Sequence, residues 1–221
     1  MKKTKNITII IAIVIATCIV YTVTFDLNQE NRLNKEVDNY LKNGTINAAI
    51  KTKNEYAKVE KLIKNDFKNF DTAANSLLEI YQNHSIVELL SAKNMEDDGP
   101  KFIETKNTIH TMKKDLDNNI DILKSIIDIN EFEKRANKEK LNKYYFDLYK
   151  DYHEKSEFES SIDLIIDENI KVYLKLDYLE QTINYLTKNN QLWSIKNNQL
   201  ISTNDKFIAE YNDLLKSINN I

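Results

Sequence analysis

The chain has 221 residues, of which only two are Gly and one is Pro. So few turn-forming residues exclude sandwiches, barrels and doubly wound sheets, all of which need many tight turns. A single Cys excludes a disulfide framework and a thiolate zinc site, and two isolated glycines exclude Gly-rich phosphate-binding loops. The formal net charge of −3 arises from 31 Lys and Arg against 34 Asp and Glu, and this mixed, mildly acidic surface argues against nucleic acid as a partner.

An uncharged apolar segment lies close to the amino terminus. Three lysines within residues 1–6 precede residues 7–25, which carry no charge. As a helix, these 19 residues would be about 28 Å long, close to the thickness of a bilayer's hydrocarbon core. Lysines before the segment and acids after it (Asp26 and Glu30) predict that residues 1–6 are cytoplasmic. Residues 26–221 are then expected to form an extracytoplasmic domain at the cell membrane.

Three interpretations of the apolar segment are open. In the first, residues 7–25 remain as a single-span transmembrane anchor. In the second, the segment is a lipoprotein signal in which Ile15-Ala16-Thr17-Cys18 is the lipobox and Cys18 is lipidated. In the third, it is a cleaved secretory signal, although no A-x-A site follows the apolar run. The first is favoured, because Ile19-Val20-Tyr21 continues the apolar run where a mature lipoprotein usually becomes polar.

Beyond residue 25, apolar residues recur at intervals of three and four, which is the period of a helix. A first helix is predicted to end near residue 42, with Gly44 as its C-cap and Thr45 as the N-cap of the next helix. The second helix is predicted over residues 46–92. The Gly99-Pro100 turn stops it and reverses the chain, so that the next helix runs antiparallel to it.

The third helix is predicted from residue 101 to a weak break at residues 128–130. Further helical stretches follow, with a soft spot at residues 188–190 and a last stretch that includes Trp193 and Leu200. No strand is predicted, because no Asn-Gly turn separates two alternating runs. Helices with one apolar stripe must pack on each other. The sequence thus predicts an all-α fold: an elongated antiparallel bundle of three to four long, coiled-coil-like helices, preceded by an N-terminal membrane helix.

Residues with catalytic or metal-binding chemistry do not form a recognisable pattern. A di-metal helical bundle needs Glu three residues before His, but Tyr81, Asn107 and Lys150 hold those positions before His84, His110 and His153. His84 falls on a core row and is expected at the edge of the core. The serines lie in helical patterns rather than on strained turns. We predict no catalytic site, no metal site and no cofactor, and therefore a protein that is not an enzyme.

Tyrosines are concentrated between residues 144 and 152. Tyr145, Tyr149 and Tyr152 share one face of a predicted helix. They could form an exposed surface for a partner or ligand, because amphipathic rings are favoured at interfaces. Alternatively, the large rings fill the space between long helices and keep their hydroxyls at the rim. The second interpretation is favoured.

The basic start and apolar segment, the Tyr-rich stretch Leu148-Tyr149-Lys150-Asp151-Tyr152 and the Phe207…Tyr211-Asn212 tail give the chain a family resemblance. It resembles the cell-wall-binding lipoproteins of low-GC Gram-positive bacteria. The resemblance implies an envelope protein with an all-helical ectodomain, and it carries over no catalytic residue.

The expected function is that of a non-enzymatic, membrane-tethered cell-envelope protein whose helical ectodomain binds a cell-wall component or a partner protein. The alternative is an accessory or sensor subunit of a membrane complex. No second apolar span follows residue 25, so signalling would then need a partner subunit.

Overall fold

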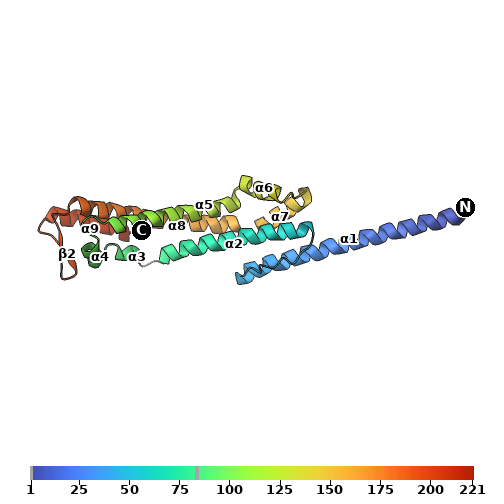
Figure 1. Ribbon diagram of the computed structural model, residues 1–221, viewed down its shortest axis with the longest axis horizontal. Coiled ribbons are helices and arrows are strands. Elements are labelled where there is room, and N and C mark those ends of the chain that lie inside the picture. Colours follow the sequence, from blue (N-terminus) through green and yellow to red (C-terminus); the bar gives the residue numbers. More distant parts are fainter. Residues whose placement is uncertain (1, 83–84) are drawn as a thin grey trace. The chain divides into compact units, whose positions relative to one another are not determined.

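The computed structural model describes the backbone of residues 2–82 and 85–221, and the side chains of residues 15–82, 86 and 88–221. The chain is mostly helical, as predicted (Figure 1). The elements in chain order are α1 (Lys2–Asn43), α2 (Glu55–Gln82), α3 (Ser85–Glu88), α4 (Ala92–Asp97), α5 (Ile103–Ile127), α6 (Ile129–Lys138), α7 (Lys143–Lys155), α8 (Phe158–Lys188), β1 (Ser194–Lys196), β2 (Gln199–Ile201) and α9 (Asp205–Asn219). Two compact units are formed: unit 1 combines Met1–Lys68 with Asp128–Phe158, and unit 2 combines Asn69–Ile127 with Glu159–Ile221.

The end of α1 agrees with the sequence, but the start of α2 does not. Gly44 has a φ of +60° and donates its N–H to the Tyr40 carbonyl at 2.7 Å, which confirms the predicted C-cap. Thr45 caps no helix, because residues 44–54 are non-helical and α2 begins at Glu55 rather than at residue 46. The predicted helix over residues 46–92 is therefore wrong at its start, where a linker stands in its place. Its end is also wrong, because α2 ends at Gln82 and the short helices α3 and α4 follow.

This linker lets α1 and α2 run parallel within unit 1. Figure 1 shows the two helices side by side. Phe25 meets Tyr56 edge-on near the beginning of the contact, and Tyr40 stacks on Phe67 at its end, with ring centroids 6.5 and 3.7 Å apart. The linker must return from the end of α1 to the level of Phe25, over about 27 Å of helix, and residues 44–54 can reach about 36 Å when extended. The sequence predicts antiparallel helices throughout the bundle. Helices α1 and α2 are parallel instead, because the linker runs back along α1 rather than reversing the chain in a tight turn.

The other helices of unit 1 begin at the predicted break. The Asp128 carboxylate accepts the N–H groups of Asn130 and Glu131 at 2.8 and 3.0 Å, so Asp128 is the N-cap of α6. Helix α6 runs antiparallel to α2, because Lys61 pairs with Glu139 whereas the later Asp66 pairs with the earlier Arg135. The buried apolar residues of unit 1 include Leu33, Val37, Tyr56, Val59, Leu62, Ile63, Phe67, Phe132, Ala136, Tyr149, Tyr152 and Phe158.

Unit 2 contains an antiparallel pair formed by α5 and α8. Lys106 donates to Thr187 at 3.2 Å, and Lys113, two turns later, pairs with the earlier Asp177 at 2.7 Å. The heptad-like stripe of α5 forms its buried face, as the sequence indicated. The buried apolar residues of unit 2 include Ile109, Met112, Leu116, Ile120, Leu123, Ile126, Ile162, Leu176, Leu179, Ile183, Leu186, Phe207 and Tyr211.

A short β-hairpin corrects the expectation that the chain contains no strand. Helix α8 ends at Lys188, at the predicted soft spot, and the antiparallel strands β1 and β2 follow it. Asn197 and Asn198 form the turn with φ of 52° and 59°. Asn tolerates this left-handed conformation, so an Asn-Asn pair makes the same two-residue turn as Asn-Gly.

At the hairpin turn, two substitutions are expected to change the free energy of unfolding in opposite directions. Replacing Asn198 by Gly removes the cost of a Cβ at positive φ, and we expect the free energy of unfolding to rise by under about 1 kcal/mol. Replacing Asn198 by Val puts a β-branched residue in that conformation, and we expect a loss of about 1–2 kcal/mol. Urea denaturation of both variants, followed by far-UV circular dichroism, checks the prediction; equal midpoints for Gly and Val would contradict it.

Gly99 has no room for a side chain. A Cβ there would lie 2.3 Å from the Met95 carbonyl oxygen and 3.2 Å from Trp193 Cη2. We expect Gly99→Ala to lower stability by about 1–3 kcal/mol, because the clashing atom is backbone and cannot move aside alone. Gly44→Ala is the contrasting variant, since no atom lies within 4 Å of its Cβ position and only its positive φ opposes the change. Thermal melts of both variants measure the difference, and a harmless Gly99→Ala would contradict this account.

Within the described part of the chain, no helix is long and apolar enough to cross a membrane. The side chains of residues 1–14, which include much of the predicted span over residues 7–25, lie outside the described residues, as does His84.

Candidate functional site

The tyrosines of the predicted partner surface do not share an exposed face. Tyr149 is 0% exposed and Tyr152 is 5% exposed, whereas Tyr145 is half-buried and only the neighbouring Tyr144 reaches 50%. Tyr145 packs edge-on against Tyr56 with a centroid distance of 5.0 Å. The rings therefore fill the space between helices of unit 1, which corrects the surface interpretation for Tyr149 and Tyr152.

Tyr149 takes part in a buried polar cluster that joins α2, α6 and α7. Its hydroxyl donates a short hydrogen bond to Asp66, which is 1% exposed. Arg135 Nε lies 3.3 Å from Asp66 Oδ1 and donates to the Tyr149 hydroxyl at 3.3 Å. Phe132 stacks on Tyr149 at 4.2 Å and lies below the Arg135 guanidinium. The cluster therefore determines which faces of α2, α6 and α7 pack against one another.

The charge of Asp66 is poorly compensated in this cluster. Burial raises the pKa of its carboxyl to about 6, although the positive charge of Arg135 and the hydrogen bond from Tyr149 oppose the rise. Among the described residues, Asp66 Oδ1 accepts no hydrogen bond, because the Arg135 contact is an ion pair without hydrogen-bond geometry. Burial also raises the pKa of the Tyr149 hydroxyl, and the nearby Asp66 charge adds to that rise. The cluster thus contains a buried acid, Asp66, whose pKa is raised toward neutral pH.

A second set of contacts joins α7 to α1. The Tyr144 hydroxyl donates to the Glu30 carboxylate, and Tyr152 donates to the Glu30 carbonyl at 3.2 Å. Further along both helices, Lys155 pairs with Asp38 at 2.7 Å. These contacts run in the same order on both helices. Helix α7 therefore holds the half of α1 that follows the predicted membrane segment.

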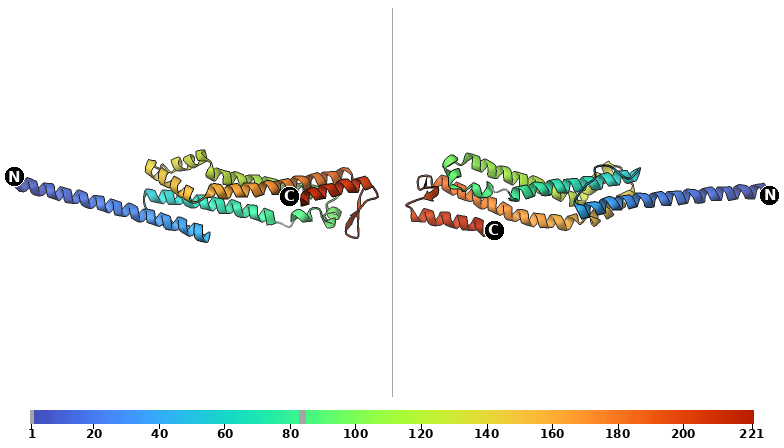
Figure 2. Two further views of the ribbon diagram at one scale, coloured as in Figure 1. Left: turned by 180° about the vertical axis from the view of Figure 1, so that it is seen from behind. Right: turned by 90° about the horizontal axis from the view of Figure 1, so that it is seen from below.

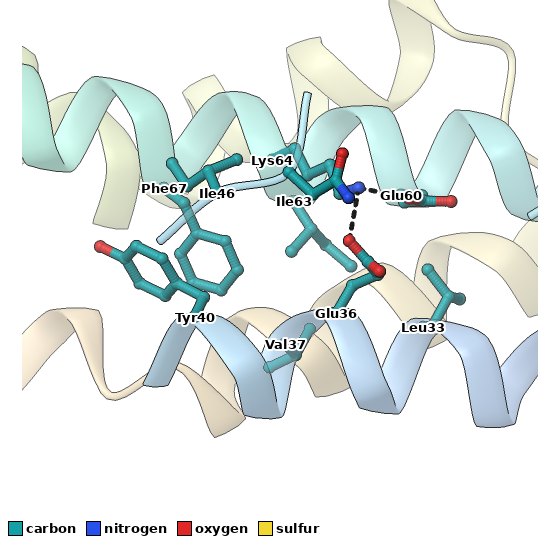
Figure 3. Close-up of a pocket in the computed structure, with 10 residues that line it drawn as sticks. Leu33, Glu36, Val37, Tyr40, Ile46, Glu60, Ile63, Lys64 and Phe67 are labelled. Carbon is teal, nitrogen blue, oxygen red and sulfur yellow. Dashed lines mark hydrogen bonds and ion pairs between the residues drawn. The ribbon is translucent and has the colours of Figure 1, made fainter. Parts of the chain in front are cut away.

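A small pocket of unit 1 contains a largely buried charge triad. Lys64, whose side chain is 9% exposed, pairs with Glu60 at 2.6 Å and with Glu36 at 2.8 Å (Figure 3). Its ammonium also donates to the Ala49 carbonyl of the linker at 2.8 Å. The cavity holds about 10 Å³, which is room for at most one water, so it is no ligand site of useful size. Its lining residues are Leu33, Glu36, Val37, Tyr40, Ile46, Asn47, Glu60, Ile63, Lys64 and Phe67.

Glu60 explains why the linker leaves the helical path. Its carboxylate accepts the N–H of Lys51 at 2.8 Å, the N–H of Thr52 at 2.7 Å and the Thr52 hydroxyl at 2.7 Å. Burial alone would raise the Glu60 pKa, but the bonds from Lys64, Thr52 and the backbone N–H groups outweigh it and lower the pKa. A carboxylate that draws backbone donors away from a helix fixes the linker in its extended form.

The other predicted residues do not meet in a site. Cys18 is exposed and lies inside α1, and its carbonyl accepts the Thr22 hydroxyl at 2.9 Å. Its lipidation stays a prediction. His110 is exposed on α5, and His153 lies edge-on to Phe132 in unit 1. No group of three His, Cys, Asp or Glu side chains in the described residues could hold a metal ion.

Sequence reasoning missed the buried charges of α2. Glu60 and Lys64 lie four residues apart on the face that also carries Tyr56, Ile63 and Phe67. The available signal was an acid and a base at an i, i+4 spacing on a core stripe, where unpaired charges are rare. That signal predicts a buried pair, but not the linker amides that complete it.

Comparisons with protein-family models, with curated proteins and with solved structures find no match for this chain.

Proposed function

We propose that the chain is a non-enzymatic, membrane-tethered cell-envelope protein whose helical body binds a cell-wall component or a partner protein. The observation that supports it most is the division of α1. Every described residue from 15 to 24 is exposed, including Ile19 at 58% and Val20 at 65%. From Leu33 onward one face of the same helix is buried against the rest of unit 1, with Leu33 at 0% and Val37 at 1%.

This division fits a helix with two different surroundings. An apolar half that no other part of the protein covers is unfavourable in water. Each exposed aliphatic side chain forgoes the stabilisation of about 1.5–3 kcal/mol that its burial would give. A bilayer would cover that half if residues 7–25 span the membrane, with residues 1–6 in the cytoplasm. The resemblance to cell-wall-binding lipoproteins supports the same location for residues 26–221. In this proposal, the body is an elongated and largely antiparallel helical bundle.

Binding by the body is tested with isolated cell walls. The full-length chain in detergent is mixed with purified wall fragments of a low-GC Gram-positive bacterium, and the pelleted fraction is measured. We expect wall-dependent pelleting that is lost after thermal unfolding of the chain. Chemical cross-linking in membranes is the parallel measurement for a protein partner. A chain that neither pellets with walls nor forms cross-links, or one that turns over an envelope substrate, contradicts the proposal.

The fate of the apolar segment is tested by mass spectrometry of the mature amino terminus. An uncleaved anchor leaves Met1 at the terminus, a lipoprotein begins at lipidated Cys18, and a secreted product begins beyond residue 25. The proposal expects an intact Met1 chain. A cleaved, unlipidated chain contradicts the tether.

The alternative function, an accessory or sensor subunit, is favoured by one specific observation. Helix α1 (Lys2–Asn43) continues without interruption from the predicted span into its packed half, which buries Leu33 and Val37. A rigid helix transmits rotation or tilt, whereas a simple tether needs only a flexible linker. Inserting Gly-Gly-Ser between Phe25 and Asp26 separates the two functions. A tether keeps its wall or partner binding after the insertion, and a sensor subunit loses the response of its complex.

A further inference from the structure

The amino-terminal part of α1 extends beyond the other helices of unit 1 (Figure 2). Where α1 meets the linker, the residues that line two hollows change from aromatic to basic along the helix. A hollow of about 370 Å³ is lined by Tyr21, Thr24, Phe25, Asn28, Gln29, Arg32 and Lys53. A second hollow of about 230 Å³ adjoins it and is lined by Arg32, Lys35, Glu36 and Lys51. Arg32 lines both hollows. Rings lie at the end nearer the amino terminus, and cations lie at the other end.

The cations of these hollows are held in place by the linker. Arg32 Nη1 donates to the Lys51 carbonyl at 2.9 Å, and the Lys53 N–H donates to Gln29 Oε1 at 2.8 Å. The side chains of Lys35, Lys51 and Lys53 form no ion pair among the described residues. These contacts hold the linker backbone at Lys51 and Lys53 against α1, so that both residues line the same hollows as Arg32.

Three acids close to this face are bound by other groups of the protein and are partly neutralised by Lys64. Glu36 pairs with Lys64 at 2.8 Å, and Glu60 is buried with the same lysine and with the linker amides. Glu30 accepts the Tyr144 hydroxyl on the side of α1 that faces α7. Arg32, Lys35, Lys51 and Lys53 together with Lys64 outnumber these three acids, so the face carries an excess of positive charge, although the body of the protein is acidic overall.

Arg32 lies on α1 just outside the predicted depth of the lipid headgroups. The predicted span over residues 7–25 is centred at residue 16, so the Cα of Arg32 lies about 24 Å from the bilayer centre along the helix. The headgroup layer ends about 20–22 Å from that centre. Helical side chains tilt toward the amino terminus, which brings the guanidinium several ångströms closer. Lys53 is tied to Gln29, which is one turn nearer the membrane.

We propose that the face formed by Arg32, Lys35, Lys51 and Lys53 binds the phosphodiester headgroups of anionic phospholipids, with Tyr21 and Phe25 at the hydrocarbon boundary. This inference rests on the proposed membrane tether. Cations held near a bilayer surface attract anionic lipids, and aromatic rings favour the interface. The bound lipids would hold unit 1 against the membrane in one orientation.

The test uses the full-length chain in two kinds of vesicle, one of phosphatidylcholine and one containing 30% phosphatidylglycerol. A membrane-impermeant amine-acylating reagent is added, and the labelling of each lysine is measured by mass spectrometry. Lys42 and Lys68 are internal controls, because both are exposed and lie farther along unit 1. We expect Lys35, Lys51 and Lys53 to be labelled at least threefold more slowly in the anionic vesicles, relative to the controls. High salt should abolish the difference.

Matched variants complete the test. From mixed vesicles, the wild-type chain should be extracted in polymer nanodiscs that are enriched in phosphatidylglycerol by about twofold. The K51Q/K53Q variant should lose this enrichment, and K42Q/K68Q should keep it. Equal lysine labelling in both vesicles, or enrichment that K51Q/K53Q leaves unchanged, overturns the lipid contact alone. A chain that alkaline carbonate removes from both vesicles overturns the tether and the lipid contact together.

Discussion

Replacing Glu60 by Ala is expected to destabilise unit 1 by about 3–5 kcal/mol, which is the usual cost of breaking a buried ion pair from one side. The variant leaves the N–H groups of Lys51 and Thr52 without their acceptor and leaves Lys64 with only one carboxylate. The linker should then lose its fixed return path along α1. Amide hydrogen exchange of the full-length chain in detergent, read over residues 49–68, should accelerate by at least 100-fold.

Two control variants separate this effect from simple loss of a charge. Glu133 is an exposed acid of unit 1, and E133A should change exchange over residues 49–68 by less than threefold. E60Q keeps one amide oxygen as an acceptor, so its effect should fall between those of the wild type and E60A. If E60A behaves like E133A, Glu60 does not hold the linker in place.

Replacing Asp66 by Asn is expected to make the protein more stable at pH 7.5 and to leave it nearly unchanged at pH 4. The pKa of Asp66 is raised from 3.8 to about 6 by burial. A raised pKa means that the folded state favours the protonated carboxyl, so its contribution is fully present below pH 3.8. That contribution is lost as the pH rises through 6. A difference of about two pKa units corresponds to about 3 kcal/mol.

The Asn side chain is uncharged and can still accept the Tyr149 hydroxyl, while Arg135, at 23% exposure, can be hydrated when its ion pair is lost. Urea denaturation midpoints of wild type and D66N at pH 4, 6 and 7.5 measure the prediction. Asp147 is an exposed acid on α7, and D147N should show no pH-dependent difference from the wild type. If D66N is less stable than the wild type at pH 7.5, the Arg135 ion pair outweighs the burial of Asp66.

The sequence was sufficient at several helix ends, although Thr45 does not cap a helix as predicted. Gly44 closes α1, Asp128 opens α6, and the polar run at residues 188–190 ends α8, each through short-range backbone chemistry. The buried stripe of α5 also followed from its periodicity alone. The helical class of the fold was therefore predictable from spacing and caps.

The sequence was not sufficient where a distant side chain or an unusual turn decides the conformation. The start of α2 depends on Glu60, which captures backbone amides eight and nine residues earlier in the chain. The hairpin depends on Asn198 adopting positive φ, although Gly is the usual residue there. The burial of Tyr149 depends on the packing of Phe132 and Asp66 from other helices. Helical spacing predicts on which face of a helix such a ring lies, but it does not predict which side chains of other helices pack over the ring.

The tether is tested most directly by protease treatment of intact bacterial protoplasts that express the full-length chain. The account predicts that external protease removes residues 26–221 while the membrane is intact, and that a protected fragment containing Met1 and residues 7–25 stays in the alkaline-washed membrane. A body that resists protease until the protoplasts are lysed, or a chain that alkaline carbonate releases whole, would contradict it.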